Sequence, residues 1–193
     1  FIRFTTGARR KQWHRNCIAI GLSGGFMEPL ESTSIHLIQR AILRLIRMMP
    51  MGEISERDIA EFNDQQHTDM LQVRDFLILH YKATDRRDSP FWRQCANMEI
   101  PDSLTQKIEL FRETGRVFRK GEELFAENSW VQVMMGQGIM PMAYHPVVTK
   151  LNDDELDHLL KGLRESVAKT VASLPEHQAY VARYCGVKDA EMA

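Results

Sequence analysis

The sequence contains no long apolar segment. None of its runs of consecutive apolar residues approaches the roughly 18 that a membrane-spanning helix needs. It also lacks the basic start, short apolar core and small-residue cleavage site of a secretory signal. These absences exclude a spanning helix, and we expect a protein without a membrane partner that resides in the cytoplasm.

Cysteine is scarce and the net charge is close to zero. The three cysteines, Cys17, Cys95 and Cys185, are widely spaced and form no C-x-x-C pair, which argues against a zinc site or a redox dithiol and fits reduced thiols. The seven histidines show no metal-ligand spacing such as H-E-x-x-H, so we expect no metal site. A formal net charge of −1 gives no field that attracts nucleic acid, so no nucleic-acid partner is expected.

The overall composition is typical of a globular protein, with 44% hydrophobic and 26% charged residues. A chain near 150 residues already buries roughly 70% of its unfolded surface, so these 193 residues can build a real core. The opening run Phe1-Ile2-Arg3-Phe4 has no initiator Met and is typical of a strand interior. We therefore expect a piece of a longer chain.

Two apolar segments near the start predict strands, at residues 1–5 and 16–21. The second is nearly continuous, which is typical of a strand buried on both faces of an α/β sheet. The residues between them, 7–15, are basic and are expected to be exposed.

A glycine-rich turn, Gly21 to Phe26, follows the second strand. Apolar residues spaced by three and four then predict a helix over 33–49, with Ser32 as its N-cap and Pro50 after its end. Glycines let a backbone approach a ligand closely, and a helix start attracts anions. The turn lacks both G-x-G-x-x-G and the Walker pattern, so a ligand-binding loop and an ordinary tight connection are both open on the pattern alone.

The rest of the chain predicts helices. Ser55 is expected to cap a long helix to about Tyr81, and Pro90 falls near the first turn of a short one. Further helices are expected at 104–118, 128–136, 152–172 and 176–184. The connection between the helices at 128–136 and 152–172 is expected to be irregular. The predicted fold class is mostly α. Residues 1–50 would be the last strand, loop and helix of an α/β domain, and residues 51–193 a helical module.

Several segments of the chain resemble one known family. The run Glu28-Pro29-Leu30-Glu31-Ser32-Thr33 after a glycine-rich turn resembles the flavin-dependent tryptophan halogenases, and the similarity extends from Asn16 to Gln39. The segments Asp75 to Tyr81, Asp88 to Trp92 and Asn128 to Gly138 are similar to the same family. The likeness covers nearly the whole chain, as the C-terminal portion of a larger flavin monooxygenase-like fold. It implies that residues 1–50 belong to an FAD-binding domain and that residues 51–193 form a helical substrate-binding module.

The resemblance implies a reaction. In this family halide attacks a flavin hydroperoxide, and the hypohalous acid that forms halogenates an aromatic ring. It implies reduced FAD supplied by a separate flavin reductase, chloride or bromide, and an indole-type substrate such as tryptophan, free indole or an indole derivative. The family's lysine beside the substrate, its dinucleotide fingerprint and its Trp-x-Trp-x-Ile-Pro motif are absent from these 193 residues. The segment alone is therefore expected to be inactive.

The resemblance also implies site residues. Glu31 matches the family's essential glutamate, which orients the oxidant and stabilises charge on the arene; a solvated carboxylate near a helix start is the alternative. Thr33 and Ser34 match the halide-binding pair, which acts through backbone N–H groups; a plain helix cap is the alternative. Familiar members have Gly where this chain has Ser34. Leu22 and Ile35 match flavin contacts, and could otherwise be core residues.

The substrate pocket departs most from the family. Phe125 falls where a tryptophan is usual, Ser129 where an asparagine is usual, and Lys120 near a glutamate that would bind a substrate ammonium. Glu122 and Glu123 are close enough in sequence to compensate. Trp130 is either a pocket wall or, as helical tryptophans more often are, a core residue.

These departures make free indole or an indole-bearing molecule as good a candidate as free tryptophan. Two other functions stay open: a flavin-binding monooxygenase-like protein without halogenation, and a non-catalytic helical interaction module. A second copy of the chain is a candidate partner in a homodimer.

Overall fold

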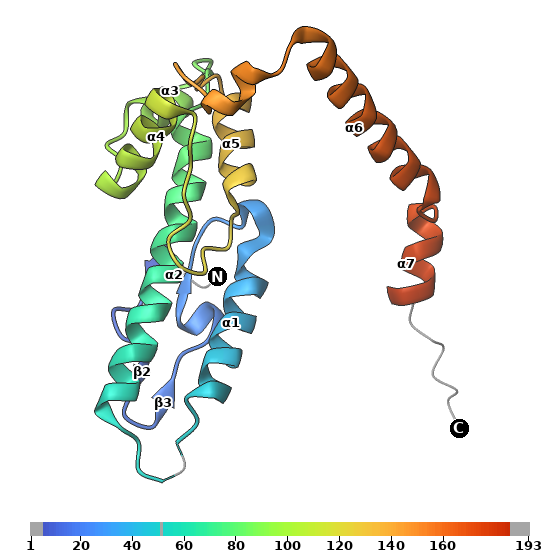
Figure 1. The fold of residues 1–193 in the computed structure, drawn as a ribbon. Coiled ribbons are helices and arrows are strands. Elements are labelled where there is room, and N and C mark those ends of the chain that lie inside the picture. Colours follow the sequence, from blue (N-terminus) through green and yellow to red (C-terminus); the bar gives the residue numbers. More distant parts are fainter. Residues whose placement is uncertain (1–5, 51, 186–193) are drawn as a thin grey trace. The chain divides into compact units, whose positions relative to one another are not determined.

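The structure is a computed structural model that describes residues 6–50 and 52–185. It divides into two compact units, Phe1–His145 and Pro146–Ala193, and each is described by itself. The strand expected at residues 1–5 lies outside the described residues. In the first unit α1 packs against α2 (Figure 1), so the two sides of the expected division between residues 50 and 51 are in contact. That division stays a prediction.

The long helix α2 (Glu56–Lys82) is the main support of the first unit. The Ser55 hydroxyl accepts a hydrogen bond from the Arg57 N–H at 3.2 Å, which confirms the expected cap. Helix α1 (Thr33–Arg47) lies beside α2 and is also close to its predicted bounds. The buried side of α2 carries aromatic and aliphatic residues that belong to two hydrophobic clusters. Apolar residues at helical spacing lie on one side of a helix in this way.

The strands are shorter than expected. Strand β1 (Gly7–Ala8) pairs antiparallel with β4 (Gly25–Phe26), and β2 (Trp13–His14) pairs antiparallel with β3 (Cys17–Ile18). The expectation of a strand over 16–21 buried on both faces was wrong: within the described residues β3 has a single neighbour, and Cys17 is exposed. A continuous apolar run does not distinguish a buried strand from a short hairpin that leads into a packed turn.

The expectation that residues 7–15 are exposed was also wrong in part. Trp13 is 2% exposed and meets Phe62 of α2 edge to face, with ring centroids 5.5 Å apart. Asn63 holds this segment, since its Oδ1 accepts from the N–H groups of Gln12 and Trp13 and its Nδ2 donates to the Trp13 carbonyl. The Trp13 ring therefore anchors this basic segment to α2.

Three further helices complete the first unit: α3 (Pro90–Asn97), α4 (Asp102–Thr114) and α5 (Glu127–Gly136). All three were expected, although α4 ends four residues earlier than predicted. Gly115 explains that end: its φ of +68° is left-handed, and a Cβ there would lie 2.6 Å from the Ala143 carbonyl oxygen.

Two hydrophobic clusters hold the first unit together. One joins α2, α4 and α5 around Phe76, Leu79, Leu104, Phe111, Trp130 and Met134. The other joins the β2 segment, α1 and the first half of α2 around Trp13, Ala41, Ile59 and Phe62. The cavity that concerns function lies between the glycine-rich turn and the beginning of α1.

The second unit contains a 3-10 turn η3 (Pro146–Lys150), α6 (Asp153–Ser173) and α7 (His177–Cys185). Asn152 and Glu155 form a reciprocal capping box at the start of α6. Over the described parts of both units, no helix is long and apolar enough to cross a bilayer.

Candidate functional site

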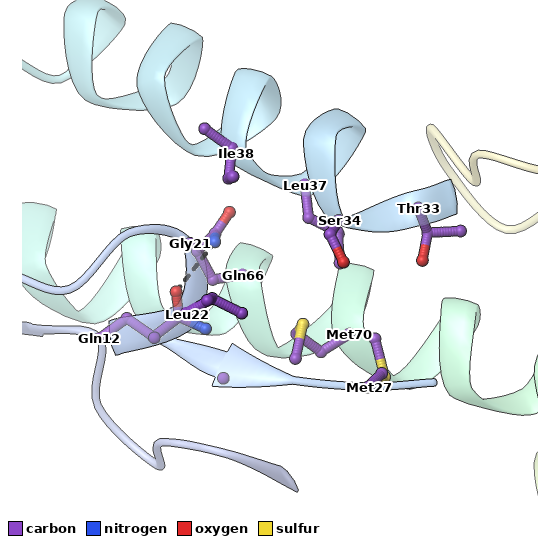
Figure 2. A pocket seen from close by; sticks show the side chains of 12 residues that line it. Gln12, Gly21, Leu22, Met27, Thr33, Ser34, Leu37, Ile38, Gln66 and Met70 are labelled. Atoms are coloured by element: carbon purple, nitrogen blue, oxygen red, sulfur yellow. Dashed lines mark hydrogen bonds between the residues drawn. The ribbon is translucent and has the colours of Figure 1, made fainter. Parts of the chain in front are cut away.

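A cavity of about 280 Å³ opens between the glycine-rich turn and the first turn of α1. Gly21 and Leu22 of the 3-10 turn η1 (Gly21–Ser23) line one side, and Thr33 and Ser34 line the other (Figure 2). Its remaining wall is largely apolar and includes Met27, Leu37, Ile38 and Met70. The cavity therefore brings a glycine turn and a helix start to the same space.

Two successive residues with left-handed backbones precede α1. Glu31 has φ +63° and Ser32 has φ +52°, a conformation that costs non-glycine residues on the order of 1 kcal/mol or more each. Ser32 stands at the N-cap position of α1, as expected, but its side chain makes no capping hydrogen bond. An N-cap residue whose hydroxyl serves the helix normally has an extended backbone.

This backbone turn sets where the helical N–H groups begin. Thr33 and Ser34 are the first two residues of α1, and N–H groups at those positions have no acceptor within the helix. Thr33 is 3% exposed. The Ser34 side-chain oxygen points toward the cavity (Figure 2). The helix start can therefore offer donors and the positive end of its dipole to an anion there. Their role in binding halide stays a prediction.

The predicted flavin contacts are both exposed apolar residues. Leu22 is 76% exposed and lines the cavity, and Ile35 is 66% exposed and follows Ser34 in α1. Neither side chain is therefore buried by the residues that the structure describes. The exposed Leu22 side chain is available to a ligand in the cavity, whereas Ile35 is not among the residues that line it. The assignment of both residues to flavin stays a prediction.

A buried polar network fixes α1 to α2 beneath the cavity. Asp69 Oδ2 accepts from Arg40 Nε at 3.0 Å and from Arg44 Nη2 at 2.8 Å. Arg44 also donates to the side chain of Gln66, which in turn donates to Gln12 Oε1 at 3.0 Å (Figure 2). Buried charges are stable only when paired and hydrogen-bonded, so this network locks the two helices and the β2 segment in one arrangement.

Glu31 contacts α2 through a histidine. Its Oε1 lies 3.7 Å from His80 Nε2. The His80 ring meets Phe76 edge to face at 4.8 Å, and Phe76 stacks on Phe125 with centroids 3.7 Å apart. Phe76 also meets Trp130 edge to face at 4.8 Å. A chain of contacts therefore joins the carboxylate of Glu31 to Phe125, a predicted substrate-binding residue that we call the aromatic wall.

The predicted substrate region is partly closed by an ion pair. Lys107 Nζ lies 2.6 Å from Glu123 Oε1, and the Glu123 side chain is 2% exposed. The same Lys107 ammonium lies 3.9 Å from the Trp130 ring centroid. Glu123 is thus already neutralised, and Trp130, at 1% exposed, is a core residue. Glu122 instead pairs with Arg40 at 3.4 Å and is largely exposed.

The remaining predicted substrate residues lie around this ion pair. Lys120 donates its backbone N–H to Glu123 Oε2 at 3.2 Å, and its side chain is exposed. Phe125 precedes α5, and Ser129 lies in the first turn of that helix, where both are partly buried. No structural contact assigns either one to a substrate.

Sequence reasoning missed His80 and Phe76 as parts of this site. They are four residues apart on α2, the separation that puts two side chains on one helical face, and that spacing was the available signal. The sequence did not show that this face meets Glu31 and Phe125 together. In residues 6–50 and 52–185, no three His, Cys, Asp or Glu side chains lie close enough to hold a metal ion.

The glycine turn and the start of α1 enclose an apolar cavity. Such a cavity suits a protein that binds an aromatic ring and an anion together. The model of the tryptophan halogenase family matches residues 1–153. The chain therefore belongs to the tryptophan halogenase family.

Solved structures give the same result. Xcc4156, a flavin-dependent halogenase from Xanthomonas campestris, is 55% identical with a TM-score of 0.90, over 95% of this chain and 37% of that one. BrvH, a flavin-dependent halogenase from Brevundimonas sp. BAL3, is 42% identical with a TM-score of 0.87, over 94% and 37% of the two chains. Among curated relatives, the tryptophan 6-halogenase SttH of Streptomyces toxytricini is 31% identical over 94% of this chain. The chain spans only 35–37% of the length of these relatives.

Proposed function

We propose that the complete protein is a flavin-dependent halogenase that chlorinates or brominates an indole ring. One observation carries the proposal beyond family membership. A short loop places the Glu31 carboxylate directly before a helix start that lines an apolar cavity. Glu31 is thus close in the chain to the predicted halide site at Thr33 and Ser34. This arrangement suits a reaction in which halide is converted to an oxidant and a carboxylate directs that oxidant to the substrate.

The lining of the cavity supports a flavin as its ligand. Its glycine turn is tightly packed, since a Cβ at Gly24 would lie 2.8 Å from the Ala19 carbonyl oxygen and one at Gly25 2.8 Å from the Gly7 carbonyl oxygen. The Leu22 side chain of this turn is left exposed beside the cavity. Leu22 and Ile35 would hold the ring, and the N–H groups of Thr33 and Ser34 would hold chloride or bromide. When bound, reduced FAD supplies hypohalous acid from oxygen and the halide.

The protein's own residues would then direct this oxidant. Glu31 would orient it and stabilise the positive charge that develops on the arene, which a preorganised carboxylate does strongly in a dry site. The face of Phe125 would pack against the indole, with Ser129 at the edge of that pocket. A separate flavin reductase is the proposed partner, as membership of the family implies.

The test uses the complete protein with a flavin reductase, FAD and either chloride or bromide. We expect halogenated indole from the wild type and a loss of about 100-fold in Glu31→Gln, since the variant lacks the charge while keeping the shape. Glu28→Gln is the matched control in the same loop, because Glu28 is exposed and outside the cavity; it should stay within about threefold of wild type.

Each outcome has a distinct meaning. Activity that is unchanged in Glu31→Gln removes this residue from the mechanism. A wild-type protein that binds and reoxidises flavin but halogenates nothing supports the monooxygenase-like alternative. Failure to bind flavin at all leaves the helical interaction module.

A further inference from the structure

His80 is held in one orientation by its own helix. Its Nδ1 lies 2.8 Å from the Phe76 carbonyl oxygen one turn earlier. A carbonyl can only accept, so Nδ1 carries the hydrogen of that bond. The ring also packs edge to face on the Phe76 side chain, at 4.8 Å and 81°. Both contacts come from Phe76, which is 2% exposed and part of the main core.

This orientation presents the second ring nitrogen to Glu31. Nε2 lies 3.7 Å from Glu31 Oε1, and the His80 side chain is 17% exposed against 46% for Glu31. The glutamate is therefore the more exposed of the two partners. A long, half-exposed side chain loses rotamer freedom when it is fixed, and the only described ionic partner that limits Glu31 is this imidazole.

The same helical turn also supports the predicted substrate wall. Phe76 stacks on Phe125 at 3.7 Å with an angle of 22° between the rings. The main-chain and side-chain contacts of a single residue, Phe76, thus set the positions of both His80 and Phe125. The imidazole that faces Glu31 and the aromatic wall are therefore both positioned by one segment of α2.

We propose that His80, as an imidazolium with a hydrogen on both ring nitrogens, is a positioning residue whose Nε2–H holds the Glu31 carboxylate in register with the aromatic wall at Phe125. The inference rests on the proposed function, because it concerns the delivery of oxidant to the ring. It does not concern the formation of the oxidant. The step that suffers when His80 is lost is the attack on the indole, while the yield of hypohalous acid is maintained.

Two substitutions separate the two ring nitrogens. Asn can place an amide N–H near the position of Nδ1 but has nothing at that of Nε2, whereas Gln can place an amide N–H near Nε2. In the complete protein with reductase, FAD and bromide, we expect His80→Asn to lower kcat for indole by about tenfold with KM within about twofold. His80→Gln should recover most of that loss, and His67→Asn, on the exposed face of the same helix, should have no effect.

A trap for free hypohalous acid, such as monochlorodimedone, should be halogenated equally by wild type and His80→Asn. In the Glu31→Gln background His80→Asn should have no further effect on kcat, because a residue that acts through another is non-additive with it. A purely structural role would instead lower trap halogenation along with indole halogenation.

A second readout needs no turnover. With labelled histidines in the complete protein, Glu31→Gln should shift the NMR signals of the His80 ring and leave those of His67 in place. Unshifted His80 signals, or a His80→Asn variant with normal kcat beside an active wild type, overturn the inference and leave the proposed function intact. A wild type that halogenates no indole overturns both.

Discussion

Ser34 allows the backbone and the side chain of a single residue to be tested separately. If halide binds to the helix-start N–H groups, Ser34→Ala and Ser34→Gly should keep the KM for chloride or bromide within about twofold, since both retain the N–H. Ser34→Pro removes it, and proline is tolerated in the first turn of a helix. Loss of one hydrogen bond to a charged group, worth about 1.5–3 kcal/mol, should raise that KM by about 10- to 100-fold.

The measurement is the halide dependence of the initial rate in the complete protein. A circular dichroism spectrum and an unfolding midpoint close to those of wild type would show that Ser34→Pro is folded. A halide KM that changes in Ser34→Ala as much as in Ser34→Pro would instead show that the hydroxyl binds the ion.

The residue scale is also where sequence reasoning was least complete. A Ser before an apolar-periodic segment predicted a side-chain cap, but Ser32 has a left-handed backbone and makes no such bond. That conformation is stabilised by contacts of neighbouring elements with the loop, and one such contact, between Glu31 and His80, joins residues 49 positions apart in the chain. Local sequence does not encode contacts of that range.

The pairing of α1 with α2 depends on one carboxylate. Asp69 is 7% exposed and accepts from both Arg40 and Arg44. We expect Asp69→Ala to lower the free energy of unfolding by about 3 kcal/mol, because removing one partner leaves a buried guanidinium uncompensated. Urea unfolding monitored by tryptophan fluorescence measures this change, since Trp13 lies in the core that these helices share.

Asp88→Ala is the matched control, since its ion pair with Arg86 is exposed at both ends and exposed pairs contribute little to stability. Equal unfolding midpoints for the two variants would contradict a structural role for Asp69. Asp69→Ala should also weaken flavin and halide binding indirectly, because the start of α1 lines the cavity.

At the scale of elements, helices were predicted well and strands poorly. Periodicity and caps are local, so Ser55, Pro90 and the apolar spacing of α2 were enough to place helices within a few residues. Strand burial depends on which neighbours cover each face, and residues 16–21 carry no information about that. The structure has a short hairpin, whose two strands have two residues each, where a buried strand was expected.

The whole molecule determines which indole can be bound. A tryptophan substrate brings an ammonium group that needs an acidic partner. Glu123 is neutralised by Lys107 and buried, and Glu122 pairs with Arg40 on the surface. In the complete protein we therefore expect kcat/KM to be higher for free indole, or for an indole derivative without a free ammonium, than for tryptophan.

Lys120 is the position at which this preference can be reversed. Its backbone is held on both sides, by the N–H bond to Glu123 and by a 2.9 Å bond from Gln72 Nε2 to its carbonyl, so a new side chain there should not disturb the fold. Lys120→Glu should raise the ratio of kcat/KM for tryptophan over indole by about tenfold, the value of one charge-assisted hydrogen bond of about 1.5 kcal/mol. Lys120→Gln removes the positive charge without adding a negative one and should give a smaller change. Competition between the two substrates in a single reaction measures the ratio directly, and a ratio equal in wild type and Lys120→Glu would show that the ammonium is bound elsewhere.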